Sequence, residues 1–250
     1  MISKAKIKQI RALDLKKNRD ELGVFVAEGP KVVKELMGVY TCSYLAATQN
    51  WADANKNISI SDIVTKEELT RASFLKTPQE VLAVFKQKAT PKDFDASATI
   101  QQELCFALDC IQNPGNLGTI IRLADWFGIR HIFCSADTAD AYAPKTVQAT
   151  MGALARVQVH YLSLENLLSS LPEGTSTYGT FLNGENIYQQ PLKQCGLIVM
   201  GNEGRGIRPS LEPYISQRLY IPSYAIGPTS ESLNVAIATA IVCAEFRRRN

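Results

Sequence analysis

The apolar and polar positions between Leu104 and Cys134 predict a strand, a turn, a helix and a second strand. Leu104–Leu108 and Ile129–Cys134 are short apolar runs, which is typical of buried strands. Between them lie a polar, glycine-rich turn at Gln112–Gly118 and apolar residues at helical spacing over Thr119–Phe127. An ordinary strand–helix–strand unit explains the apolar pattern but not the composition of the turn, and ligands of open α/β sheets bind at such edges.

Two further buried strands in the second half of the chain also end in unusual loops. The expected loops are Gly201–Gly206, after an apolar run, and Pro222–Asn234, which leads into a final helix. Such loops gather at the carboxyl edge of a parallel sheet and can share one pocket. Gly201–Gly206 reads GxxGxG, and the chain has neither the dinucleotide pattern GxGxxG nor a GK[ST] phosphate loop. A pocket lined by backbone groups with few charges suits a neutral purine and an amino-acid tail better than a triphosphate.

The first ninety residues alternate between expected helices and strands, which indicates a small α/β domain. The strands are expected at Val24–Ala27, Tyr44–Ala47, Ile58–Ile60 and Val81–Phe85. A polar stretch follows that contains proline and lacks periodicity, as in a linker. We therefore expect a first domain at residues 1–90, a linker at 91–103 and a second α/β domain at 104–250.

Composition limits which cellular compartment and which metal chemistry we expect for this protein. Of the 250 residues 46% are hydrophobic and 20% charged, and no apolar run approaches the roughly 20 residues of a membrane span. The N-terminal stretch has no apolar segment behind its positive charges, so we expect a cytoplasmic protein. Six scattered cysteines without a CxxC pair, and only two histidines, favour buried thiols and predict no metal site.

Positive charge is concentrated at the N-terminus, although the net charge is only +3. Asp14 is the only acidic residue among the first nineteen, which include seven cations: Lys4, Lys6, Lys8, Arg11, Lys16, Lys17 and Arg19. Such a cluster suits a phosphate backbone. A solvated basic helix face explains it equally well.

Three ordered runs resemble the motifs of a known family. They are NPGNLGTIIRLADWFG, LIVMGNEGRGI and IPSYAIGPTSESLNVAIATAI. Together they resemble the SpoU/TrmH family of RNA ribose 2′-O-methyltransferases, which belongs to the SPOUT superfamily. The N-terminal run IRALDLKKNRDELGVFVAEGPKVVKEL is similar to the small RNA-binding domain that precedes many of these enzymes.

The resemblance implies an α/β fold in which a SPOUT-type core, knotted as a trefoil, follows a small RNA-binding domain. It also implies a homodimer and S-adenosylmethionine as cofactor. The catalytic positions that it implies are Asn116, Arg122, Glu203, Ser232 and Asn234. Those implied to hold the cofactor are Met200, Gly201, Ile221, Pro222 and Leu233. The candidate RNA-binding residues are Lys16, Lys17, Arg19 and Glu28, the last two of which fit a purely structural role as well.

The reaction that the resemblance implies is attack by a ribose 2′-oxygen on an activated methyl carbon, so the protein must align the partners and help to remove one proton. The family account assigns proton removal to the arginine, yet a guanidinium scarcely ever loses its proton. Our hypothesis is that Arg122 binds the neighbouring phosphate and polarises the hydroxyl.

We expect ribosomal RNA, and 23S RNA in particular, to be the substrate. Transfer RNA is the alternative substrate. A non-catalytic RNA-binding or ribosome-assembly protein on the same fold, or an α/β enzyme for another nucleotide, are the alternative functions.

Overall fold

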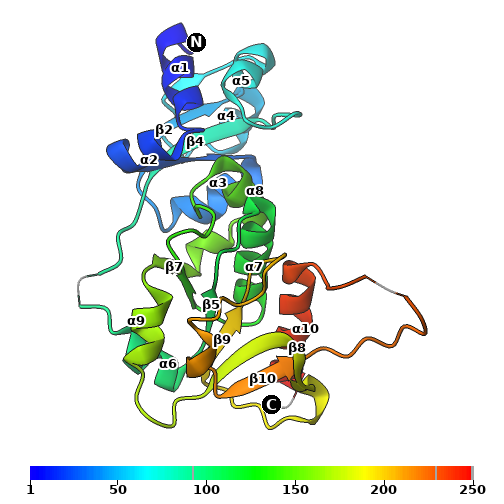
Figure 1. The fold of residues 1–250 in the computed structure, drawn as a ribbon. Helices are drawn as coiled ribbons and strands as arrows, with labels where there is room; N and C mark the ends of the chain where they lie inside the picture. Colours follow the sequence, from blue (N-terminus) through cyan, green and yellow to red (C-terminus); the bar gives the residue numbers. More distant parts are fainter. Residues whose placement is uncertain (92, 229, 249–250) are drawn as a thin grey trace. The chain divides into compact units, whose positions relative to one another are not determined.

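The computed structural model describes residues 1–91, 93–228 and 230–248, which form two compact units (Figure 1). The first unit combines Met1–Ala89 with Asp140–Ala155, and the second combines Thr90–Ala139 with Arg156–Asn250. The domain boundaries expected from the sequence assign residues 140–155 to the second domain, whereas the structure packs them in the first unit.

Contacts between residues far apart in the sequence hold Asp140–Ala155 in the first unit. Asp140 Oδ2 forms an ion pair with Arg19 Nη2 at 2.5 Å, and the Tyr142 ring lies 4.7 Å from the ring of Phe25. Helix α8 (Pro144–Thr150) packs against strand β1. No local sequence pattern reports such contacts, so the sequence does not reveal this arrangement.

The stretch expected to be a linker contains a helix, α6 (Ala96–Gln102). The Asp95 carboxylate caps it by accepting a hydrogen bond from the Ala98 N–H at 2.9 Å. Its Ile100 side chain is fully buried, and the helix packs against strands of the second unit. The helix is short and largely polar, so it shows little apolar periodicity.

The first unit is built on a four-stranded sheet. In spatial order its strands are β1 (Val24–Glu28), β4 (Val81–Lys86), β2 (Cys42–Ala47) and β3 (Asp62–Ile63). β4 is antiparallel to both neighbours, and β3 is parallel to β2. The other helices of this unit are α1 (Lys4–Ala12), α2 (Lys16–Leu22), α3 (Pro30–Met37), α4 (Gln49–Ala54), α5 (Lys66–Ala72) and the 3-10 turn η1 (Ala153–Ala155). The strand predicted at Ile58–Ile60 was wrong, because the pairing with β2 begins only at Asp62.

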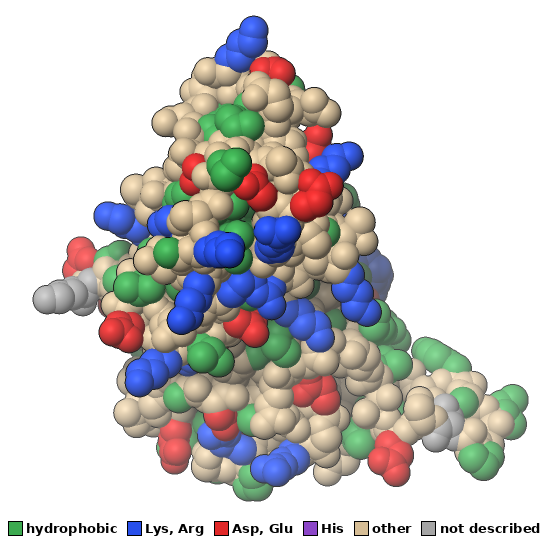
Figure 2. Space-filling model, turned by 90° about the horizontal axis from the view of Figure 1, so that it is seen from above, with side chains coloured by type: hydrophobic (Ala, Val, Ile, Leu, Met, Phe, Trp, Pro, Cys, Tyr) green, Lys and Arg blue, Asp and Glu red, His purple; other side chains and the backbone are tan. Residues whose placement is uncertain are grey.

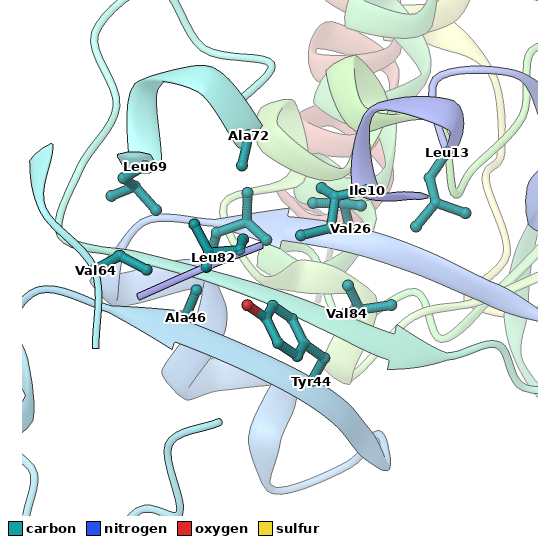
Figure 3. Packing of buried hydrophobic residues seen from close by; sticks show 11 residues of the cluster. Ile10, Leu13, Val26, Tyr44, Ala46, Val64, Leu69, Ala72, Leu82 and Val84 are labelled. Carbon is teal, nitrogen blue, oxygen red and sulfur yellow. The ribbon is translucent and has the colours of Figure 1, made fainter. Parts of the chain in front are cut away.

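The core of this unit lies between the sheet and its helices. On one face Val26, Leu82 and Val84 form a buried cluster with Ile10 of α1 and Leu69 of α5 (Figure 3). Successive side chains of a strand point to opposite faces, and α3 and α8 pack on the sheet as well. Burial on both faces explains why the strands read as continuous apolar runs.

The second unit contains a six-stranded sheet in which every pairing is parallel. Its spatial order is β10 (Gln217–Tyr220), β8 (Thr177–Asn186), β9 (Gly196–Met200), β5 (Leu104–Leu108), β6 (His131–Cys134) and β7 (Gln158–Tyr161). The remaining elements are α7 (Pro114–Trp126), α9 (Leu164–Ser169), α10 (Val235–Arg248) and the 3-10 turns η2 (Ile187–Gln189) and η3 (Glu212–Tyr214). The α/β class predicted from the sequence is confirmed.

Helices cover both faces of this sheet. Ile100 of α6 and Leu167 of α9 share one apolar cluster with Cys105 of β5. On the other face α10 lies beside α7, and its Phe246 ring contacts the Tyr178 ring of β8 at 4.8 Å. Residues 222–228 and 230–234, between β10 and α10, extend away from the sheet in Figure 1. In the described part of the chain, no helix has both the length and the apolar character needed to cross a bilayer.

Candidate active site

Helix α7 begins earlier than the sequence predicts, at Pro114 rather than Thr119. The Asn113 carboxamide oxygen accepts hydrogen bonds from the N–H groups of Gly115, at 2.8 Å, and Asn116, at 3.3 Å. Proline at the first helical position has no N–H to leave unpaired. Most of the expected glycine-rich turn is therefore the first part of a helix, and Asn116 lies in that first turn.

Glu203 lies on a tight hairpin after β9, which we call the Glu203 hairpin (residues 201–207). The N–H of Asn202 bonds the carbonyl of Gly206, and the N–H of Gly206 bonds the carbonyl of Asn202, both at 2.9 Å. A Cβ atom on Gly201 would lie 2.2 Å from the Gly206 carbonyl carbon, so only glycine fits there. Gly206 has φ +69°, a conformation that also favours glycine.

Asn234 immediately precedes α10 and caps it. Its carboxamide oxygen accepts hydrogen bonds from the N–H groups of Ala236, at 2.9 Å, and Ile237, at 3.4 Å. Ser232, which the resemblance implies to be catalytic, is exposed and has no hydrogen bond to any residue that the structure describes.

Three side chains from the three motifs form one hydrogen-bonded chain. Asn234 Nδ2 donates to Asn116 Oδ1 at 3.2 Å, and Asn116 Nδ2 donates to Glu203 Oε1 at 2.9 Å. An ionised carboxylate only accepts hydrogen bonds, so Asn116 must turn its amide nitrogen toward Glu203 and its oxygen toward Asn234. The convergence of the three segments, which the sequence predicts, is present in the structure.

Arg122 does not take part in this chain. It follows Asn116 by six positions, which on an α-helix corresponds to a rise of about 9 Å and a rotation of about 240°. Its side chain is exposed and has neither a hydrogen bond nor an ion pair to the described residues. Within a single chain, the structure therefore separates the expected arginine from the Asn116–Glu203 pair.

The residues expected to hold the cofactor lie where strands β9 and β10 end and where α10 begins. Met200 and Gly201 are buried, Ile221 and Pro222 are half-buried, and Leu233 is exposed. Leu233 precedes Asn234, whose hydrogen bond to Asn116 places this segment near the Glu203 hairpin. Apolar side chains, backbone groups and one nearby carboxylate suit a neutral purine joined to a positively charged sulfonium.

Two of the four expected RNA-binding residues are buried, and for them that expectation is corrected. Arg19 is 2% exposed and donates to the carbonyls of Leu13 and Asp14, each at 2.7 Å, besides its ion pair with Asp140. Its guanidinium therefore connects α2 to the α1–α2 turn and to Asp140 within the first unit.

Glu28 is 6% exposed and accepts hydrogen bonds from the Ser73 hydroxyl and from the Phe74 N–H. Burial raises the pKa of the Glu28 carboxyl, and these hydrogen bonds oppose the rise. Lys16 and Lys17, by contrast, are exposed.

Sequence reasoning missed three residues that support the site. Asn202 donates from Nδ2 to the Cys110 carbonyl at 2.7 Å, and its Oδ1 accepts hydrogen bonds from the backbone N–H groups of Gly204 and Arg205. Asp109 and Arg208 form an ion pair behind the hairpin. The available signal was a carboxylate directly after the apolar strand Leu104–Leu108. Across the described ranges, no group of three or more His, Cys, Asp and Glu side chains is arranged to hold a metal ion.

Comparison with known proteins places this arrangement in a family. The model of the SpoU rRNA methylase family matches residues 103–244, and that of the MRM3-like substrate binding domain matches residues 4–83. The 23S rRNA guanosine 2′-O-methyltransferase RlmP of Bacillus subtilis is 31% identical over 248 residues, covering 97% of this chain and 96% of that protein.

Solved structures of related proteins support the same family. A TrmH-family protein from Porphyromonas gingivalis is 41% identical with a TM-score of 0.87, covering 100% of both chains. An rRNA methyltransferase from Sinorhizobium meliloti, solved with bound AdoMet, is 31% identical with a TM-score of 0.86, covering 100% of this chain and 97% of that one. The chain therefore belongs to the SpoU rRNA methylase family.

Proposed function

We propose that this protein transfers a methyl group from S-adenosylmethionine to a ribose 2′-hydroxyl of ribosomal RNA, with 23S RNA as the expected substrate. The observation that carries the proposal is the hydrogen-bonded chain from Asn234 through Asn116 to Glu203, which joins all three motifs. The names of the relatives support the substrate class, since RlmP and several RlmB proteins are 23S rRNA 2′-O-methyltransferases. This substrate also fits the expected cytoplasmic location.

The pocket residues fit the cofactor. Met200, Gly201, Ile221, Pro222 and Leu233 would hold the purine and ribose through backbone groups and apolar contacts. When bound, S-adenosylmethionine supplies a methyl group that its positively charged sulfur activates. The AdoMet-bound structure from Sinorhizobium meliloti supports this choice of cofactor.

The work of the protein is to orient the sugar and to prepare one proton for removal. Asn116 holds the Glu203 carboxylate in place, so the free lone pairs of Glu203 can accept a hydrogen bond from an RNA hydroxyl. We propose that Arg122 binds the adjacent phosphate and polarises the 2′-hydroxyl, since its planar guanidinium can make two hydrogen bonds at once. An Arg122→Lys variant that keeps nearly full turnover would contradict this role.

We further propose that the protein is a homodimer in which Arg122 lies at the contact. Two large apolar side chains of helices α7 and α10 are exposed: Trp126 at the end of α7, 83% exposed, and Ile237 near the start of α10, 54% exposed. Arg122 is four positions before Trp126 and therefore shares its side of the helix. A second copy covering this side of α7 would bury Trp126 and bring Arg122 toward a neighbouring chain. Sedimentation should give a dimer for the wild type and a monomer for Trp126→Glu.

The trefoil knot expected from the family remains part of the proposal. Contacts at the end of α10 support it: Gln194 Nε2 donates to the Phe246 carbonyl at 2.7 Å, and Arg247 Nη1 donates to Gln194 Oε1 at 3.0 Å. These bonds hold the last helix against the segment that precedes β9.

We assign RNA recognition to the first unit, through phosphates and local shape. Lys16 and Lys17 are exposed there. Several Lys and Arg side chains are visible on the surface drawn in Figure 2. The similarity of residues 4–83 to a substrate binding domain supports this assignment.

Two measurements test the proposed function. Calorimetry with S-adenosylmethionine should show binding, and an absence of binding would favour an enzyme for another nucleotide. Transfer of labelled methyl groups should then be measured on ribosomal RNA and on transfer RNA, with the modified nucleotide mapped. Label in transfer RNA alone would replace the ribosomal substrate, and cofactor binding without transfer to any RNA would favour a non-catalytic RNA-binding protein.

A further inference from the structure

A buried carboxylate lies directly behind the Glu203 hairpin. Asp109 follows strand β5 and is 1% exposed. Its Oδ2 accepts a hydrogen bond from the Arg208 N–H at 2.8 Å, and its Oδ1 accepts one from Arg208 Nε at 2.5 Å. Both oxygens of the buried carboxylate thus accept hydrogen bonds from Arg208, one from its backbone N–H and one from its side chain.

Arg208 is the first residue after the hairpin, so this contact fixes the point where the hairpin ends. The other end is tied to the same loop after β5: the Asp109 N–H bonds the Met200 carbonyl at 2.9 Å, and Asn202 Nδ2 bonds the Cys110 carbonyl at 2.7 Å. Both ends of a hairpin of only seven residues are therefore anchored on Asp109 and Cys110.

A second carboxylate completes the support. Arg208 Nη2 lies 3.0 Å from both oxygens of Asp137. Asp137 in turn accepts from the Ser135 hydroxyl at 2.5 Å, which is the main reason why its pKa is lowered. The Ser135 oxygen also accepts from the Cys110 N–H at 2.8 Å. Contact with Asp109 raises the pKa of Arg208, so its charge persists.

We propose that Asp109 is a positioning residue for methyl transfer: by holding Arg208, it sets the hairpin at the place where Glu203 meets Asn116. This inference rests on the proposed function. Asp109 has no exposed oxygen to offer to RNA or cofactor, so it acts through Glu203. A shift of the hairpin by about 1 Å at a reacting centre costs on the order of 100-fold in rate, which is the scale on which such a support acts.

The test compares two matched aspartates. In Asp109→Asn an amide NH2 group replaces one carboxylate oxygen, and this group cannot accept a hydrogen bond from Arg208. Asp140 gives the control, because one of its oxygens accepts from the Tyr142 N–H and the other pairs with the buried Arg19, in the first unit. Asp140→Asn therefore disrupts a similar bond pair away from the Glu203 hairpin.

We expect Asp109→Asn to lower kcat by at least about 10-fold while changing the KM for RNA by less than about threefold, and Asp140→Asn to leave kcat within about twofold. In a Glu203→Gln background, Asp109→Asn should have almost no further effect on kcat, because residues that act through one another are not additive. Additive losses, or an unchanged kcat in Asp109→Asn, would overturn the proposal.

Two further measurements keep the inference testable if a variant folds poorly or if the protein methylates no RNA. Arg208→Lys keeps the charge but lacks the fork that reaches both Asp109 and Asp137, and it should lower kcat by an intermediate factor. Hydrogen exchange needs no activity: the amides of Gly206 and Arg208 should exchange at least about 10-fold faster in Asp109→Asn than in Asp140→Asn. Equal amide exchange rates in the two variants would refute the idea that Asp109 supports the Glu203 hairpin. Faster exchange in Asp109→Asn, in a protein that shows no transferase activity, would refute only the proposed function.

Discussion

Replacing Asn116 by aspartate should make methyl transfer depend on pH in a new way. The change is isosteric, but it exchanges the amide that donates to Glu203 Oε1 at 2.9 Å for a second carboxylate. Two like charges at this separation repel by about 6 kcal/mol at an effective dielectric constant of about 20, and solvent reduces this value for a half-buried group. The pair should therefore share one proton, with the upper apparent pKa raised above that of an ordinary carboxyl group.

The size of the effect follows from the bond that is lost. A hydrogen bond to a charged group contributes about 1.5 to 3 kcal/mol. If that contribution holds Glu203 in place for the reaction, its loss lowers kcat by about 10- to 150-fold. Above the raised pKa both carboxylates are charged, and Asn116→Asp should show this full deficit. Below it, one proton restores an O–H···O bond, so the deficit relative to wild type should shrink to less than about 10-fold.

The assay is single-turnover methyl transfer at about pH 6 and about pH 8.5, always as a ratio of variant to wild type, because the reaction itself also depends on pH. Asn116→Ala is the control: it removes the donor without adding a charge, so its deficit should be the same at both pH values. A deficit of Asn116→Asp that does not change with pH, or wild-type activity in either variant, would refute the role assigned to the Asn116–Glu203 bond.

Three further predictions concern other parts of the chain. Gly201→Ala should abolish activity and lower the melting temperature, because its Cβ would overlap Gly206; a stable, active variant in a thermal melt and methyl-transfer assay would contradict the tight hairpin. Lys17→Ala should raise the KM for RNA by about 2- to 10-fold and reduce the salt dependence of RNA binding, with no change in calorimetric affinity for S-adenosylmethionine; a change confined to the cofactor would oppose the assignment. Burial lowers the pKa of His160 to about 4, so unfolding by denaturant should require less free energy as pH falls from about 6.5 toward 4. In His160→Gln this part of the pH dependence should be lost.

The sequence predicts much of the local structure of this protein because the relevant signals are local. Strand β5 spans the predicted Leu104–Leu108. Thr65 and Ser163 cap α5 and α9, positions at which threonine and serine are strongly preferred. Gly128 follows α7 with φ +67°, a conformation that glycine commonly adopts just after a helix. Each feature depends on side chains within a few positions of the backbone groups that they satisfy.

Features that depend on contacts between distant segments are harder to predict. The basic character of Arg19 suggested RNA binding, but Arg19 is buried and its ion-pair partner Asp140 is 121 positions away. The rings of His131 on β6 and His160 on β7 stack on Phe94, at 5.1 Å and 4.4 Å, and no local pattern around either histidine predicts that contact. The start of α7 was predicted too late in the sequence, because its glycines are typical of a turn. The cap at Asn113, which shows that the helix begins at Pro114, is visible only in the structure.

The candidate site shows the same division. The three motifs identified Asn116, Glu203 and Asn234, and the structure brings these three together. It leaves Arg122 on another side of α7, so a role for Arg122 now depends on the proposed second copy. Asp109 and Arg208 lie at the ends of loops that resemble ordinary polar connections, and only their contact distinguishes them.

Nucleoside analysis of methylated RNA tests the central claim most directly. Ribosomal RNA that lacks the modification would be incubated with the protein and S-adenosylmethionine carrying a labelled methyl group, digested to nucleosides and separated by mass. If the three segments form a site that acts on a sugar, the label should appear in one 2′-O-methylated nucleoside and fall by about 10-fold or more in Asn116→Ala. Label on a base, or equal label from Asn116→Ala and the wild type, would contradict the account.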